Sequence, residues 1–210
     1  MHFSSLINYF VSLVVICSPL SALPAFLSLT HGRSENEIKR TGIVAGAAVG
    51  VILIVVIWMG SPILHFFGVG IPAFRFAGGF VVFMLSLSML QAEQSRMKQT
   101  SEDQKAASRK HSIAVVPLAM PIMAGPGAIS RVIVAVNEYP GMLNQLSLSI
   151  SAVAVAAVLG TVLYFATNIE AALGRTGINI INRIGGLILA AMATQSMAAG
   201  LIGLFPFLNG

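Results

Sequence analysis

Two long segments without charged residues constrain this fold most. No Asp, Glu, Lys or Arg lies between Arg40 and Arg75, and none lies between Glu138 and Glu170. Each segment exceeds the roughly 20 apolar residues that cross a bilayer as a helix. Only 9% of the 210 residues are charged, whereas soluble domains carry about a quarter. The sequence therefore predicts an all-α protein that crosses a membrane several times.

Hydropathy divides the chain into six predicted spans, at residues 6–29, 42–64, 73–90, 113–137, 146–168 and 178–204. The one long polar stretch, residues 91–111, is rich in Gln, Ser and Lys and is typical of a flexible connector. We therefore expect a single membrane domain. Its parts are a first three-helix repeat at 1–91, a cytoplasmic polar linker at 92–111 and a second three-helix repeat at 112–210.

The two halves resemble each other at two places. The string PLSALP (19–24) matches PIMAGP (121–126) at an offset of 102 residues, and GIPAFRFAGG (70–79) matches GINIINRIGG (177–186) at an offset of 107. A five-residue difference in the intervening segment would reconcile the two offsets. Because each half holds three spans, the second half must start on the opposite side of the membrane. The prediction is an inverted repeat, an arrangement in which many secondary transporters bind their substrate near the bilayer midplane.

Basic residues indicate the orientation of the chain. The first-to-second, third-to-fourth and fifth-to-sixth connections hold Arg33, Lys39, Arg40, Arg96, Lys98, Lys105, Arg109, Lys110 and Arg175. By the positive-inside rule that side is cytoplasmic, so both termini are expected outside. The net charge of +5 is scattered over these connections and forms no single basic face, which argues against a nucleic-acid partner. The single Cys17 excludes a disulfide within one chain.

Proline and glycine interrupt the first and fourth spans. Each proline frees a carbonyl that lipid cannot satisfy, so the breaks either only shape the bundle or form a site. If the breaks form a site, Pro24 and Pro126 lie at or near the first turn of a second half-helix. The amides after Pro126 would then bind a carboxylate, and freed carbonyls would hold an ammonium group or a metal cation. The predicted substrate site is Ser18, Pro19, Ser21, Ala22, Pro24, Met120, Pro121, Ala124, Gly125, Pro126, Gly127 and Ser130.

Ionisable residues inside the spans are few. Glu138 and Glu170 lie at span ends, which argues against a relay of protons between carboxylates. The coupling ion could be Na⁺, held by backbone carbonyls, or H⁺, and transport without a fixed protein acid is also left open. Arg75 and Arg183 precede two Gly-Gly pairs at similar depths. Each either extends to the interface or satisfies carbonyls freed by the break in the opposite half. Thr194 and Gln195 are further candidates to line a cavity, and no metal site or cofactor is predicted.

Small residues recur at every fourth position in three of the spans. They are Gly42, Gly46 and Gly50 in the second span, Ala152, Ala156 and Gly160 in the fifth, and Gly186, Ala190, Thr194 and Ala198 in the sixth. Such spacing predicts close packing between membrane helices.

The strings VVPLAMPIMAGPGAIS, FRFAGG and TGINIINRIGG resemble the MarC family of small bacterial and archaeal membrane proteins, also grouped as neutral amino acid transporter-like proteins. The similarity runs from SPLSALPAF to GLFPFLNG. The resemblance implies six spans and, in some members, uptake of small neutral amino acids such as glycine and alanine. The family pattern usually has Asn-Pro in the first broken helix, where this chain has Ser18 before Pro19. A hydroxyl there replaces an amide and removes a carbonyl acceptor.

The leading prediction is a secondary transporter of small neutral amino acids or similar zwitterions in the bacterial or archaeal cytoplasmic membrane. It would work by alternating access and draw on an ion gradient, because no GxxxxGK[ST] phosphate loop exists. The alternatives are export of another small metabolite or drug, a passive channel, or a scaffold. An enzyme is not predicted, since HExxH, GxSxG and a Cys-His pair near the breaks are all absent. Association into a homo-oligomer is left open.

Overall fold

The computed structural model describes residues 3–30, 32–91, 123–205 and 207, and it contains no strand in these ranges. The helices are α1 (Phe3–Cys17), α2 (Pro19–Leu29), α3 (Glu35–Phe66), α4 (Ile71–Leu90), α6 (Pro126–Glu138), α7 (Met142–Tyr164) and α8 (Ala166–Leu204). The α8 segment bends at Gly174, which has a φ of 61°. The all-α prediction is confirmed for this part of the chain.

Five segments within the described ranges are long and apolar enough to cross a membrane. They are Ser4–Leu27, Glu35–Phe66, Ile71–Leu90, Met142–Tyr164 and Thr176–Leu204. These segments coincide with the first, second, third, fifth and sixth predicted spans. The second part of the predicted fourth span forms α6, while its first part and the predicted linker at 92–111 lie outside the described residues.

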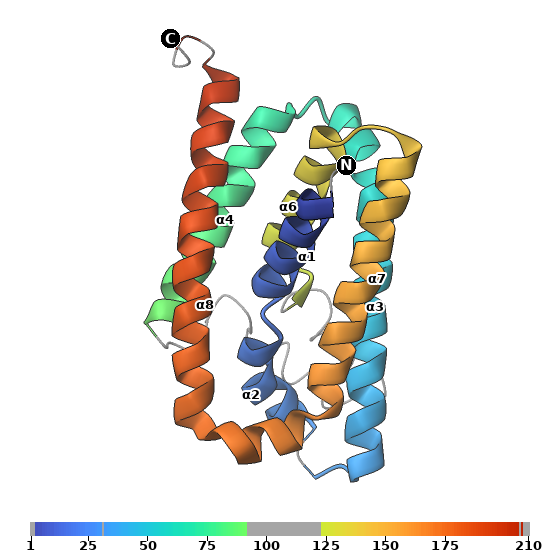
Figure 1. Cartoon of the computed structure of the whole chain (residues 1–210), viewed down its shortest axis with the longest axis vertical. Helices are drawn as coiled ribbons and strands as arrows, with labels where there is room; N and C mark the ends of the chain where they lie inside the picture. Colours follow the sequence, from blue (N-terminus) through green and yellow to red (C-terminus); the bar gives the residue numbers. More distant parts are fainter. Residues whose placement is uncertain (1–2, 31, 92–122, 206, 208–210) are drawn as a thin grey trace.

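The helices form two long pairs with three short helices between them. In Figure 1, α4 and α8 pack together along one side and α3 and α7 along the other, with α1, α2 and α6 in the middle. The middle helices bridge the pairs, because α6 contacts both α4 and α3, and α2 contacts both α8 and α7. Large apolar side chains such as Val51, Ile150 and Leu187 point outward, with exposures of 61%, 71% and 65%. Outward apolar surface of this extent suits contact with lipid.

Glycine brings α3 and α7 into backbone contact. A Cβ on Gly46 would lie 2.7 Å from the Cα of Gly160 and 2.8 Å from the carbonyl oxygen of Ala156. A Cβ on Gly42 would lie 2.9 Å from the carbonyl carbon of Leu163. Neither position has room for a side chain. The close packing expected from the small-residue spacing is confirmed for this pair.

The two Gly-Gly pairs join α4 to α8. A Cβ on Gly79 would lie 3.1 Å from the carbonyl oxygen of Ala193 and 2.8 Å from the Cγ of Met197. A Cβ on Gly186 would lie 3.1 Å from the carbonyl oxygen of Ser86 and 3.3 Å from the Cγ of Leu90. Gly79 therefore allows α8 to approach α4 closely, and Gly186 allows the same close approach at a second place along the two helices.

The interruption in the first span begins earlier than the sequence predicts. The α1 helix ends at Cys17, Ser18 adopts a left-handed φ of 43°, and α2 begins at Pro19. Pro24 lies inside α2, so the placement of Pro24 at the start of a half-helix is wrong. Pro19 takes the first helical position, where a proline sacrifices no helical hydrogen bond.

The interruption before α6 is where the sequence predicts it. Gly125 is the extended N-cap residue and Pro126 is the first helical residue. Pro19 and Pro126 thus both begin a helix, and they are 107 residues apart, the offset that also relates the Gly-Gly pairs. The expected five-residue difference between the halves is unnecessary in this register.

Candidate functional site

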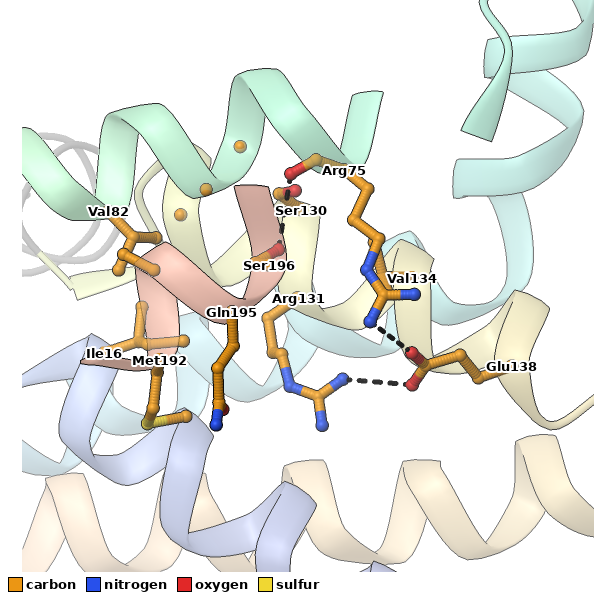
Figure 2. A pocket seen from close by; sticks show the side chains of 14 residues that line it. Ile16, Arg75, Val82, Ser130, Arg131, Val134, Glu138, Met192, Gln195 and Ser196 are labelled. Carbon is orange, nitrogen blue, oxygen red and sulfur yellow. Dashed lines mark hydrogen bonds and ion pairs between the residues drawn. The ribbon is translucent and has the colours of Figure 1, made fainter. Parts of the chain in front are cut away.

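A cavity of about 170 Å³ lies between α1, α4, α6 and α8. Figure 2 shows side chains from these four helices converging on it, with charged groups at one end and apolar groups at the other. The cavity is next to the start of α6, because Gly127 in the first turn of that helix lines it. Ile16, in the last turn of α1, lines the same wall.

Two arginines and one glutamate form the charged end. Nη2 of Arg75 lies 2.9 Å from Oε1 of Glu138, and Nη1 of Arg131 lies 3.6 Å from Oε2 of the same carboxylate. The three side chains come together from α4 and α6 and point toward one another (Figure 2). Two guanidinium groups thus face a single carboxylate, so basic groups outnumber acidic ones at this end.

Neighbouring helices hold the guanidinium of Arg131 and the backbone of Arg75 in position. Nε of Arg131 donates a hydrogen bond to the hydroxyl of Ser12 at 3.2 Å, and that hydroxyl donates to the carbonyl of Tyr9 at 2.8 Å. The Arg131 guanidinium also lies over the Tyr9 ring, with its Cζ 5.5 Å from the ring centroid, which is a cation–π contact. The hydroxyl of Ser196 donates to the carbonyl of Arg75 at 3.3 Å. The Arg131 guanidinium is thus held by α1, whereas the contact from α8 holds only the backbone of Arg75.

The rest of the cavity changes from polar to apolar. Its polar middle is formed by Ser130, Gln195 and Ser196, and its apolar end is formed by Ile16, Val82 and Met192 (Figure 2). Ser130 is almost fully buried, with an exposure of 4%. The cavity therefore offers hydroxyl and amide groups between the charged end and the apolar end.

Gly127 shapes the apolar end by having no side chain. A Cβ at this position would lie 2.6 Å from Cγ2 of Val82 and 3.6 Å from Cγ2 of Ile16. These distances also show that the first turn of α6 lies beside the last turn of α1. The two interrupted spans therefore approach each other at the cavity.

The amides at the start of α6 are less available than expected. The amides of Ala128 and Ile129 both donate to the carbonyl of Gly125, at 3.0 and 3.2 Å. Gly127 is then the remaining donor of the first turn, since Pro126 has no amide hydrogen. Because two amides of this helix start already have a backbone partner, an anion would find fewer donors there than the sequence predicts.

Four residues chosen from the sequence line the cavity: Arg75, Gly127, Ser130 and Gln195. Three others, Ala124, Gly125 and Pro126, come directly before Gly127 in the chain but do not themselves line the cavity. Met120 and Pro121 lie outside the described residues.

The remaining candidates lie elsewhere. Pro19, Ala22 and Pro24 belong to α2, which does not line the cavity. Ser18 and Ser21 share a hydrogen bond, and Ser21 donates to Oδ1 of Asn182 at 2.9 Å, so they form a separate polar cluster between α2 and α8.

Two candidates on α8 lie outside the cavity. The Thr194 hydroxyl donates to its own helix at Ala190, 2.9 Å away, and Arg183 is exposed. Neither residue lines the cavity. No group of three or more His, Cys, Asp or Glu side chains that could hold a metal occurs within the described ranges.

Sequence reasoning missed Arg131 and Glu138. Glu138 was treated as a span-end carboxylate, yet it lines the cavity and pairs with two arginines. One signal was available, because the two residues are seven positions apart on α6 and therefore share a helix face. Their partner on α4, by contrast, follows only from the packing of two helices.

The fold and cavity define a polytopic integral membrane protein with a charged internal site. The chain matches the family model described as MarC family integral membrane protein over residues 3–205. It therefore belongs to the MarC family.

Relatives occur in bacteria and archaea. The chain is 34% identical to the UPF0056 membrane protein YvbG of Bacillus subtilis over 210 residues, with 100% of both chains covered. It is 33% identical to YhcE of Escherichia coli, with 95% of this chain and 93% of the relative covered. It is also 33% identical to a UPF0056 membrane protein of Methanocaldococcus jannaschii, with 92% and 94% covered. No solved structure matches this chain.

Proposed function

We propose that this protein is a secondary transporter for small neutral amino acids in the cytoplasmic membrane, with both termini outside. The observation that carries the proposal is the cavity among the membrane helices, with two arginines at one end and an apolar wall at the other. A guanidinium binds a carboxylate through two parallel hydrogen bonds, so this end suits the carboxylate of the substrate.

The rest of the substrate fits the remaining surfaces. An ammonium group would meet neutral oxygens in the polar middle, at Ser130, Gln195 and Ser196. A short side chain would then point toward Ile16 and Val82. This orientation differs from the sequence-based one, in which the start of α6 bound the carboxylate.

The cavity volume favours a small solute over a drug. Pockets for drug-sized ligands measure roughly 300–1,000 Å³, and this cavity measures about 170 Å³. Glycine and alanine are the smallest amino acids and suit a site of this size. Export of a bulky compound through the same site would require a large rearrangement of the packed helices.

The matching contacts of the two Gly-Gly pairs support alternating access. Adding 107 to Gly79 gives Gly186, and subtracting 107 from Ala193 gives Ser86. The approach of Gly79 to the carbonyl of Ala193 thus corresponds to the approach of Gly186 to the carbonyl of Ser86, and a Cβ on either glycine would lie 3.1 Å from that oxygen. Such reciprocal contacts are expected of repeats related by a two-fold axis. We propose that the two halves form an inverted 3+3 repeat whose interrupted helices move between the long pairs.

Counterflow in proteoliposomes tests the proposed function. Vesicles preloaded with unlabelled glycine should take up radiolabelled glycine faster than empty vesicles, and the uptake should saturate. A channel would show flux without counterflow, and a scaffold would show neither. Absence of glycine or alanine counterflow with correctly inserted protein would contradict the proposal.

Val82→Ala is expected to admit larger side chains, because Val82 closes the apolar end of the cavity. One methylene in an apolar pocket changes discrimination by roughly 1–3 kcal/mol, or about 10–200-fold. Valine should therefore inhibit glycine uptake at a concentration about tenfold lower than in the unmodified protein. The matched control is Val81→Ala, on the same helix and exposed. Unchanged selectivity in Val82→Ala would show that this wall does not contact the substrate.

A further inference from the structure

We propose that Glu138 is the proton-binding site that couples this transporter to the proton gradient, an inference that rests on the proposed function. The substrate carboxylate and the Glu138 carboxylate compete for the same two guanidinium groups. When the substrate displaces Glu138, Glu138 binds a proton from the aqueous phase open to the cavity. When the substrate leaves, Glu138 returns the proton and pairs again with Arg75.

The ion pairs show why the two carboxylates compete. Arg75 approaches Glu138 to 2.9 Å and Arg131 approaches it to 3.6 Å, so both guanidiniums already face this carboxylate. Arg131 is tied to α1 through Ser12 and therefore cannot turn freely toward a second anion. A substrate carboxylate that reached both arginines would lie within a few ångströms of Glu138. A carboxylate that loses its cationic partners beside a second negative charge favours its protonated form.

Arg75 itself has unused hydrogen-bonding capacity at this site. Its Nε is buried and has no hydrogen-bond partner among the described residues. A buried donor without a partner is unfavourable, and a carboxylate that bound along the Nε edge of the guanidinium would satisfy it. The Nε edge of the guanidinium thus offers the substrate carboxylate a first contact before Glu138 is displaced.

Glu138 is the single carboxylate on the four helices α1, α4, α6 and α7. The carboxylates of α3, Glu35 and Glu37, lie in its first turn. The far end of α3 lies near Glu138, because Ser61 accepts a hydrogen bond from Asn137 at 2.9 Å. On these helices, therefore, no second carboxylate near the cavity could bind the proton in place of Glu138.

Several other titratable or charged groups lie on the elements that pack near Glu138. Arg75 comes from α4 and Arg131 from α6 itself, while α1 contributes Tyr9 against the second arginine. The last turn of α3 carries His65, and Tyr139 follows Glu138 in the chain. The α7 helix has no Asp, Glu, Lys, Arg or His. His65 is thus the competing candidate for a proton site.

The experiment separates exchange from proton-driven accumulation in proteoliposomes containing a trapped pH-sensitive dye. In the unmodified protein, an inwardly directed proton gradient should concentrate glycine, and added glycine should drive proton entry. Each variant is compared with its own rate of glycine counterflow, since exchange needs no net proton movement, and the decisive variant is Glu138→Gln. It should lose both accumulation and glycine-driven proton entry, while Glu138→Asp should retain them.

Two controls make the result specific. Glu170→Gln, on α8 and outside the cavity, and His65→Gln should both behave like the unmodified protein. Proton-driven accumulation by Glu138→Gln would overturn the inference, and so would loss of coupling in His65→Gln alone. Counterflow by the unmodified protein, with neither proton-driven accumulation nor glycine-driven proton entry, would overturn the coupling and leave the transport function standing. Absence of counterflow would instead contradict the transport function itself.

Discussion

Gly78→Ala is expected to disrupt the packing of α4 on α6, and Ser130→Gly is expected to restore it. A Cβ added to Gly78 would overlap the Oγ and the Cβ of Ser130. Rotation of the serine side chain removes only the first overlap, because a Cβ moves only with its backbone. The helices must therefore separate. Overpacking typically costs about 1–3 kcal/mol and occasionally more, and 3 kcal/mol lowers the Tm of a chain of this size by roughly 6–12 °C.

The measurement is thermal stability of the detergent-purified protein, followed by size-exclusion chromatography. The double variant Gly78→Ala with Ser130→Gly should recover most of the loss, because the methyl group then occupies the space left by the serine side chain. Gly160→Ala is the matched control, since its Cβ would find its nearest neighbour 3.9 Å away. Equal stability of Gly78→Ala and the unmodified protein would contradict the described contact between α4 and α6.

Arg75→Gln is expected to weaken glycine transport about 10-fold to more than 100-fold in apparent affinity. Hydrogen bonds to charged groups contribute about 1.5–3 kcal/mol each, and every 1.4 kcal/mol is about tenfold in binding. The variant loses the guanidinium closest to Glu138 and with it one of the two proposed carboxylate partners. Arg75→Lys should be intermediate, because an ammonium keeps the charge but loses the paired geometry.

Arg183→Gln is the matched control for this prediction. Arg75 and Arg183 precede equivalent Gly-Gly pairs, but Arg183 is exposed and does not line the cavity. The apparent affinity for glycine, measured from the concentration dependence of counterflow, should be nearly unchanged in Arg183→Gln. Equal losses in the two variants would mean that the effect comes from the repeat motif and not from the cavity.

The two arginines also show how far sequence reasoning reaches. Their motifs are alike, and the sequence treats them as equivalent candidates for interfacial positions or for contacts with a break in the opposite half. Packing separates them, since the cavity lies beside Arg75 and the exposed side of α8 carries Arg183. A short motif reflects what the local backbone needs, whereas the surroundings of a side chain depend on helices that are distant in the sequence.

Helix starts show the same limit at shorter range. Pro126 begins α6 as expected, because Gly125 before it adopts the extended N-cap conformation. Pro19 and Pro24 are both compatible with a helix start, and the local sequence does not distinguish them. The chain begins α2 at Pro19 and accommodates Pro24 within the helix.

The membrane spans and the glycine contacts follow from the sequence because both depend on short-range properties. A charge-free segment must be helical in lipid, where every backbone polar group needs a partner, and glycines four residues apart must share one helix face. The charged end of the cavity does not follow from such properties. Arg75 and Glu138 are 63 residues apart in the chain, and they meet only because α4 and α6 pack through Gly78. Tertiary packing therefore determined which of the few charges in this apolar chain form a site.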